Sequence, residues 1–176
     1  MTRIGKFIRT YPMAKIVYPL DPREEELSIV DIAWGLSSIN RFNGFTHTPY
    51  SVAQHSVHVA MCLPERLRLL GLLHDASEAF LGDVVSPIKS SLGGYQQYEK
   101  NMMDVIHKKF GLMPSSQELA AVHTIDQKMR VTEQFHLTRH PVDIREGLNI
   151  RIRPWSQQKS YITFLLCFHK YYSQVD

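Results

Sequence analysis

The sequence predicts an all-α protein, a single helical bundle preceded by a short extended N-terminal arm or hairpin. From residue 28 onward apolar residues recur at helical spacing, and serine caps precede three of these segments. Only the first two dozen residues are rich in β-formers. The 176 residues, 44% of them hydrophobic and 21% charged, suit one globular domain over 1–176.

The N-terminal part divides into an arm and a first helix. Residues 6–18 mix β-forming and turn residues, and the proline-rich segment 19–22 follows as a turn. Ser28 and Asp31 have the spacing of a capping box. The apolar stripe that begins at Ile29 and ends at Ile39 therefore predicts a helix over 29–40.

Two further helices follow a loop at 41–50, which contains Gly44 and Pro49. Ser51 and Gln54 form a second capping box, which predicts a helix to about residue 63 with His55 in its second turn. Pro64 suits the first turn of the next helix. That helix is expected to run without interruption past His74 toward residue 82, where a turn over 82–87 ends it.

The C-terminal half predicts three more helices. A helical stripe over 95–110 ends at Gly111, and a third capping box, Ser115 with Glu118, begins a long helix to about residue 136. A charged loop over 138–154 leads to the last helix. Its apolar side carries Tyr161, Phe164, Leu165 and Phe168.

Composition limits the classes of function. The net charge of +3 is small and the basic residues are scattered, so no nucleic-acid partner is expected. Cys62 and Cys167 stand far apart in helix-like stretches, which is typical of reduced core residues and favours the cytoplasm. The N-terminus leads into no apolar leader, and no apolar stretch approaches the roughly 18 residues of a membrane span.

One motif carries the chemical signal. A His-Asp pair alone means little, because this composition yields roughly 0.4 such pairs by chance. Each further fixed residue cuts the chance expectation about twentyfold, so the longer string is specific. That string is His74-Asp75-x-x-Glu78-x-x-x-Gly82-Asp83-x-x-x-Pro87-x-Lys89.

Other helices must complete a metal site at this pair. Adjacent residues on a helix point about 100° apart, so His74 and Asp75 can share an ion only off the end of the helix or between their directions. His55 and Asp126 are the candidates for the remaining ligands, although Asp126 could instead cap a loop or pair with an arginine. Two imidazoles and two carboxylates leave positions open for water and substrate.

The remaining histidines are expected to be structural or solvated. They are His58, His107, His123, His136, His140 and His169. His47 stays ambiguous, because its loop could border the site.

The ordered set His55, His74-Asp75 and Asp126 resembles the HD-domain metal-dependent phosphohydrolases, over about residues 21–133. Within that superfamily, the string Tyr-Ser-Val-Ala-Gln-His-Ser at 50–56 is most similar to deoxynucleotide 5'-nucleotidases and their small phage-encoded relatives. Those relatives often carry an Arg-Trp pair before the first ligand histidine. Here the pair is Arg41-Phe42, which keeps a cation and an aromatic ring but lacks the indole.

The resemblance implies hydrolysis of phosphate esters by one divalent transition metal (Zn, Co, Mn or Fe), to which a triphosphate substrate could add Mg²⁺. Arg41 and Lys89 would bind phosphate oxygens, and Phe42 would contact the substrate. Glu78 would take a proton from the water or orient it. Asp83 would orient a ligand or protonate the leaving group.

The expected substrates are 2'-deoxynucleotides, with deoxyadenine nucleotides (dATP, dADP, dAMP) as the first choice and phosphate or triphosphate as product. The alternatives are a broad deoxynucleoside monophosphate 5'-nucleotidase and a regulatory HD protein that binds nucleotides without turnover. A nucleic-acid-binding module would need a continuous basic face, which the sequence does not suggest. We also expect a homo-oligomer, in the host cytoplasm if the chain is phage-encoded.

Overall fold

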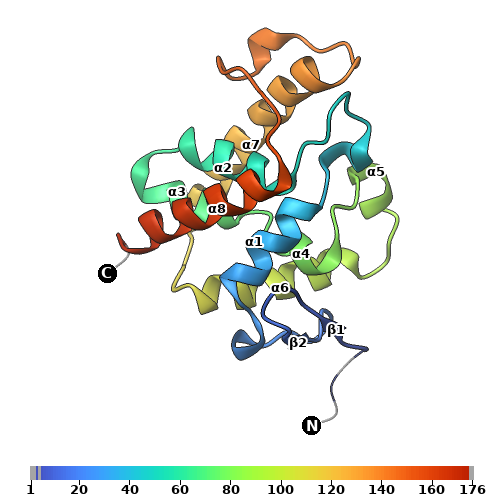
Figure 1. The fold of residues 1–176 in the computed structure, drawn as a ribbon, viewed down its shortest axis with the longest axis vertical. Helices are drawn as coiled ribbons and strands as arrows, with labels where there is room; N and C mark the ends of the chain where they lie inside the picture. Colours follow the sequence, from blue (N-terminus) through green and yellow to red (C-terminus); the bar gives the residue numbers. More distant parts are fainter. Residues whose placement is uncertain (1–2, 4, 175–176) are drawn as a thin grey trace.

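The computed structural model describes residues 3 and 5–174, with only the backbone of residues 86 and 87. Its architecture is the predicted helical bundle with an N-terminal hairpin (Figure 1). The elements are β1 (Ile8–Arg9), β2 (Ile16–Val17), α1 (Ile29–Ser38), α2 (Val52–Met61), α3 (Arg68–Leu73), α4 (Glu78–Leu81), α5 (Ser86–Lys89), α6 (Tyr95–Lys109), α7 (Ser116–Leu137) and α8 (Gln157–Tyr172). Short 3-10 turns lie at Glu24–Glu26, Arg41–Gly44, Glu65–Leu67 and Ile144–Glu146.

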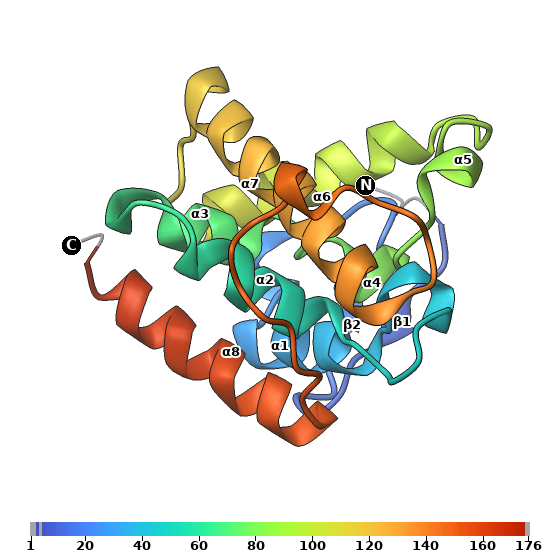
Figure 2. The same cartoon turned by 90° about the horizontal axis from the view of Figure 1, so that it is seen from above.

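Helix α2 is the central element. It packs against α1, α3, α7 and α8. In Figure 2, α8 runs along one side of α2 and α7 lies on the opposite side. The hairpin lies near the N-terminus at the foot of the molecule, and the segment between α7 and α8 crosses the top (Figure 1).

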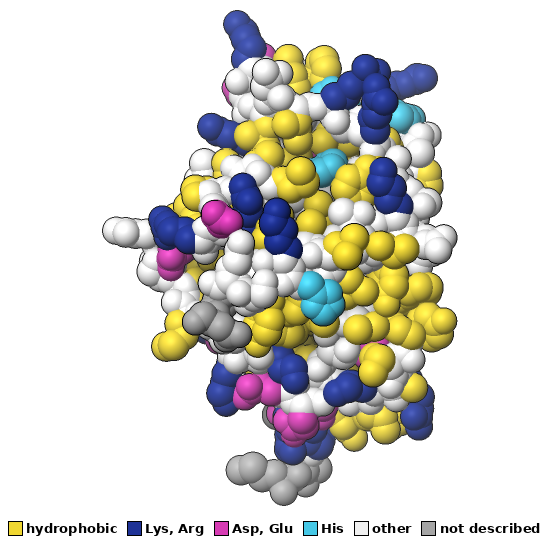
Figure 3. Space-filling view, turned by 60° about the vertical axis from the view of Figure 1, so that its left-hand side comes forward, with side chains coloured by type: hydrophobic (Ala, Val, Ile, Leu, Met, Phe, Trp, Pro, Cys, Tyr) yellow, Lys and Arg dark blue, Asp and Glu magenta, His cyan; other side chains and the backbone are white. Residues whose placement is uncertain are grey.

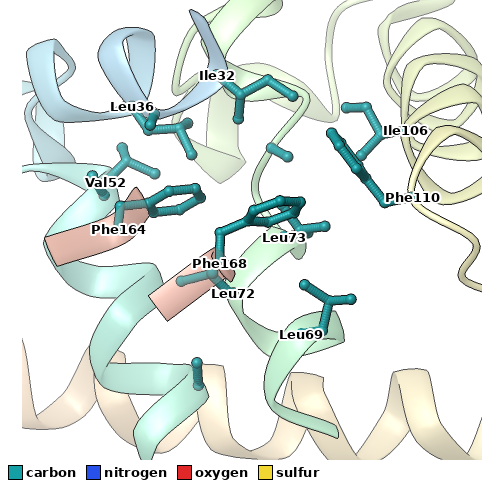
Figure 4. Close-up of a cluster of buried hydrophobic side chains, with 14 of the residues drawn as sticks. Ile32, Leu36, Val52, Leu69, Leu72, Leu73, Ile106, Phe110, Phe164 and Phe168 are labelled. Carbon is teal, nitrogen blue, oxygen red and sulfur yellow. The ribbon is translucent and has the colours of Figure 1, made fainter. Parts of the chain in front are cut away.

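Two clusters of buried apolar side chains hold the bundle together. The first joins α1, α2, α3, α6 and α8, and Figure 4 shows Phe164 and Phe168 of α8 among the side chains of Leu36, Val52 and Leu72. The second lies between α2, α3 and α7 and is built from Tyr50, Val59, Leu63, Leu67, Leu70, Val122, Met129, Leu137 and Ile152. Because α2 and α3 are covered on both sides, polar residues at their junction with α7 are held between packed helices.

The predicted hairpin forms, but the first capping box does not. β1 and β2 pair antiparallel, with Ile8 opposite Val17. Ser28 caps α1 by accepting a hydrogen bond from the Val30 amide. The Asp31 carboxylate instead accepts hydrogen bonds from Thr10 Oγ1 at 2.7 Å and the Met13 amide at 2.8 Å. Asp31 therefore fastens the hairpin to α1, a contact that the local spacing could not reveal.

The second capping box is only half formed, whereas the third is complete. Ser51 accepts a hydrogen bond from the Gln54 amide, as predicted. The Gln54 side chain, however, donates to the Arg153 carbonyl and accepts from the Trp155 amide, both at 2.8 Å. These bonds fix the entry to α8. At α7 the reciprocal Ser115–Glu118 bonds are both present.

The prediction of one uninterrupted helix over 64–82 is wrong. α3 ends at Leu73, and residues 74–77 form a turn before α4. Hydrogen bonds with three-residue spacing replace the helical ones there, from the Ala76 amide to the Leu73 carbonyl and from the Glu78 amide to the Asp75 carbonyl. The segment predicted as a turn over 82–87 runs into the short helix α5. His74 and Asp75 thus lie at the end of a helix, where both side chains can reach one point.

Two surface properties bear on the predicted partners. No helix among the described residues is long and apolar enough to cross a membrane. On the face shown in Figure 3, lysines and arginines are interspersed with hydrophobic and neutral side chains and form no continuous stripe.

Candidate metal centre

The four predicted ligands converge on one point. His55 comes from α2, His74 and Asp75 from the end of α3, and Asp126 from α7. His55 Nε2 lies 3.2 Å from Asp126 Oδ1, 3.5 Å from Asp75 Oδ2 and 3.3 Å from His74 Nε2. His74 Nε2 lies 3.1 Å from Asp75 Oδ2 and 3.9 Å from Asp126 Oδ1.

These spacings fit a divalent metal ion. Ligand atoms bound at the usual 2.0–2.2 Å are separated from one another by about 3 to 3.6 Å. Of the five separations given above, the one between His74 Nε2 and Asp126 Oδ1 exceeds that range. His55, His74 and Asp75 by themselves form a cluster whose ligand atoms all lie within 4.8 Å of one another. The mixture of imidazole and carboxylate suits a transition metal.

Hydrogen bonds on the far side of each imidazole ring set the tautomer. His55 Nδ1 lies 2.7 Å from Glu133 Oε1, and His74 Nδ1 lies 2.8 Å from the Gly71 carbonyl. Both partners are acceptors, so each Nδ1 must carry a proton. In the neutral imidazole the lone pair of each Nε2 then faces the cluster centre, as metal ligation requires.

The carboxylates of the cluster are held in their ionised form. Burial alone would raise the pKa of Asp75, but His74, His55 and Arg41 lower it far below its usual value. Burial would likewise raise the pKa of Asp126, and its hydrogen bond with His55 lowers it. Burial and Arg41 would lower the pKa of His55, yet Glu133 and Asp126 raise it to about 9. The site therefore favours a positive charge at its centre.

A polar cavity of about 310 Å³ opens beside the cluster. Its walls bring together the residues that the sequence assigned to catalysis and substrate binding, namely Glu78, Asp83, Arg41, Phe42 and Lys89, with the ligands Asp75 and Asp126. A second groove of about 1040 Å³ follows α6 and α7 and is lined by apolar side chains such as Met103 and Val122. It also reaches His74, Asp75, Lys89 and Asp126, so the cluster lies where the two cavities meet.

Arg41 reaches the cluster from a strained loop. Its Nε donates to Glu133 Oε2 at 3.0 Å, and its Nη1 lies 3.5 Å from Asp75 Oδ2. The next two residues, Phe42 and Asn43, have φ angles of 55° and 51°, a region that costs a non-glycine residue about 1 to 3 kcal/mol. Such strain is concentrated at functional sites. The Phe42 ring centroid lies 5.5 Å from Arg41 Cζ.

His47, which the sequence left ambiguous, anchors this loop outside the cavity. Its Nε2 is bonded to the His136 carbonyl at 3.0 Å, and its backbone amide donates to the Leu137 carbonyl at 3.0 Å. These contacts hold the loop against the end of α7.

Lys89 lines both cavities, but its charge is already paired. The ammonium lies 2.6 Å from Glu99 Oε1 of α6, with the side chain 24% exposed. A phosphate that binds Lys89 must therefore compete with Glu99. This contact could not be anticipated from the motif, because it joins two separate helices.

Glu78 and Asp83 form the acidic wall of the cavity. Glu78 is only 6% exposed, and its Oε2 has no hydrogen-bond partner among the described residues. Burial, Asp75 and Asp83 raise the pKa of Glu78 to about 10. Burial also raises the pKa of Asp83, although Arg41 opposes it. Without a bound ion, Glu78 therefore keeps its proton at neutral pH.

The sequence reasoning missed Glu133, Tyr50 and Arg130. Glu133 stands seven residues after Asp126, and Arg130, which lines the cavity, stands four residues after it. Those spacings place both on the same face of α7 as Asp126, which is the signal that could have found them. Tyr50 donates to Glu133 Oε1 at 2.8 Å; it begins the string at 50–56, but the sequence assigned it no role.

The chain is 33% identical over 168 residues to the uncharacterized protein RCAP_rcc00048 of Rhodobacter capsulatus, a match that covers 82% of this chain and 86% of the relative. The chain belongs to the family of that protein. No family model matches it.

Two more relatives match a shorter part of the chain. The uncharacterized protein YfdR of Escherichia coli is 38% identical over 108 residues, which covers 61% of this chain and 60% of YfdR. The 5'-deoxynucleotidase VP0926 of Vibrio parahaemolyticus is 27% identical over 112 residues. That match covers 62% of this chain and half of the Vibrio protein.

Proposed function

We propose that this chain is a metal-dependent nucleotide phosphohydrolase of the HD superfamily. The observation that carries the proposal is the convergence of two imidazoles and two carboxylates at the edge of a cavity that also holds Arg41. An arginine beside a cation site suits a phosphate, because both charges offset those of the phosphate oxygens. The relationship to the Vibrio 5'-deoxynucleotidase supports the same reaction class.

His55, His74, Asp75 and Asp126 would hold one divalent ion, which when bound supplies an activated water and polarises the phosphoryl group. Zn, Co, Mn and Fe all suit this ligand set. Arg41 would bind phosphate oxygens through its Nη atoms, since its Nε is occupied by Glu133. Lys89 would add a second positive charge after leaving Glu99.

Glu78 suits proton transfer to the leaving oxygen, because its Oε2 has no hydrogen-bond partner among the described residues and its carboxyl has a raised pKa in the metal-free chain. The sequence predicts a base or an orienting group instead. Asp83, on the same cavity wall, would orient the leaving group. Phe42 forms the aromatic wall against which a sugar or base would pack.

We take 2'-deoxynucleotides as the substrate class, with deoxyadenine nucleotides tested first. The Vibrio relative equally favours a broad deoxynucleoside monophosphate 5'-nucleotidase. A panel of nucleoside mono- and triphosphates with metal-loaded protein, measuring phosphate, pyrophosphate and triphosphate release separately, decides between them. Absence of any product while nucleotides still bind would instead favour the regulatory alternative.

Removing the positive side chain of Arg41 or of Lys89 from the cavity should weaken transition-state binding. Arg41→Ala and Lys89→Ala are each expected to cost about 2 to 4 kcal/mol in kcat/KM, the scale of one deleted preorganised donor. Arg145→Ala is the matched control, because that exposed arginine pairs only with Asp143 among the described residues. Unchanged kinetics for Lys89→Ala would show that Lys89 does not bind substrate and that its pair with Glu99 is structural.

A further inference from the structure

Glu133 is, with His55, one of the most deeply buried residues of the site. Its side chain is fully buried on α7, and three donors from other segments share its two oxygens. Oε1 accepts from His55 and Tyr50, and Oε2 accepts from Arg41. A buried carboxylate is costly unless it is paired and hydrogen-bonded. Here each of its contacts reaches a residue of the site or of the loop that carries Arg41.

We propose that Glu133 is a positioning residue that fixes both the tautomer of the metal ligand His55 and the orientation of the phosphate-binding Arg41. One carboxylate would then make metal binding and phosphate binding depend on each other. The proposal rests on the proposed function for the role of Arg41, but its geometry is independent of any substrate.

The contact with His55 determines which nitrogen faces the cluster. An ionised carboxylate can only accept, so the ring must carry its proton at Nδ1, 2.7 Å from Glu133 Oε1. Nε2 is then free for the metal. Partners of this kind are worth about 10- to 100-fold in metal affinity.

By holding Arg41, Glu133 would prevent the guanidinium group from competing with the metal for the ligand carboxylates. The Arg41 side chain is 11% exposed, and its Nη1 already lies 3.5 Å from Asp75 Oδ2. Without the bond at Nε, the planar guanidinium would be free to turn onto the ligand carboxylates and compete for them. With that bond the Nη groups stay at the cavity wall, where a phosphate can meet them.

A glutamine at position 133 cannot satisfy both partners. Its amide oxygen can accept from His55 and Tyr50, but its NH₂ group then faces the Arg41 Nε–H, donor against donor. The metal affinity of Glu133→Gln should therefore fall by less than about 10-fold. Its phosphate affinity should fall as far as that of Arg41→Ala. Glu133→Leu loses both contacts and should bind metal about 10- to 100-fold more weakly.

Two affinities measured without turnover test this inference. Chelator competition gives the Zn²⁺ affinity of each variant, and calorimetry gives the affinity of the zinc-loaded protein for inorganic phosphate. Glu118→Gln is the control, because that carboxylate caps the start of the same helix. The double variant of Arg41→Ala and Glu133→Gln should lose no more phosphate affinity than the single variants. Additive losses, or unchanged phosphate affinity in Glu133→Gln, would overturn the proposal.

A measurement on the unaltered chain covers the case in which Glu133→Leu does not fold. Nitrogen NMR of the zinc-loaded protein should find the His55 proton on Nδ1, and a proton on Nε2 would refute the assignment. If the chain binds zinc and phosphate with the expected coupling but hydrolyses no nucleotide, only the proposed function fails. If it hydrolyses nucleotides while Glu133→Gln behaves like Glu118→Gln, only this inference fails. Failure of the unaltered chain to bind zinc would overturn both.

Discussion

Asp126→Ala is expected to abolish metal binding and hydrolysis together. Asp126 Oδ1 is the group that α7 contributes, and it lies within 3.9 Å of both imidazole Nε2 atoms. Its removal would leave three of the four proposed ligands. Because an outer partner alone is worth about 10- to 100-fold in metal affinity, loss of a direct ligand should cost at least about 100-fold.

Elemental analysis after dialysis and steady-state kinetics on the same preparation measure this effect. Asp143→Ala is the control, since that carboxylate caps a distant 3-10 turn and pairs with Arg145. Normal metal content and normal kinetics in Asp126→Ala would remove Asp126 from the ligand set.

Glu78→Gln should keep its metal but lose about 10²- to 10⁴-fold in kcat, the usual contribution of a positioned acid or base. The same substitution should stabilise the metal-free protein increasingly as the pH rises. Burial and the charges of Asp75 and Asp83 hold the pKa of Glu78 near 10 in the folded chain. In the unfolded chain this carboxyl ionises near its ordinary value of about 4.3.

The direction of this change in stability with pH follows from the linkage between proton binding and folding. A raised carboxyl pKa contributes stability that is fully present below the unfolded value and is lost as the pH rises toward the folded value. Glutamine does not titrate, so the melting temperature of Glu78→Gln relative to the unaltered chain should increase between pH 5 and pH 9. A difference that stays constant over this range would show that Glu78 is ionised in the folded protein. A retained kcat would separately exclude its role in proton transfer.

The sequence predicted the helices because apolar spacing leaves a local pattern, whereas the ligand set rests on the order of His55, His74-Asp75 and Asp126 and stays a prediction. Apolar spacing marked α1, α6, α7 and α8, and the string around His74 marked the metal centre. The features that the sequence did not predict depend on contacts between distant segments. Asp31 and Gln54 looked like capping residues, yet their side chains bind the hairpin and the entry to α8. The break after Leu73 could not be predicted, because the apolar periodicity of α3 does not show where the spacing of the backbone hydrogen bonds changes from four residues to three.

The same reason explains the residues missed at the site. Glu133 lies 78 positions from His55 and 92 from Arg41, so only the packing of α7 against α2 and the loop 41–44 brings the three together. The pairing of Lys89 with Glu99 likewise depends on how α5 meets α6. A sequence motif identifies residue types, but their hydrogen-bond partners depend on how the helices pack.

The most direct test of the metal-dependent mechanism is deoxynucleotide hydrolysis during stepwise removal and return of the metal. The four-residue centre predicts that chelation abolishes product release and that activity returns in proportion to added metal, levelling at one ion per chain. Full hydrolysis by exhaustively metal-free protein would contradict the account.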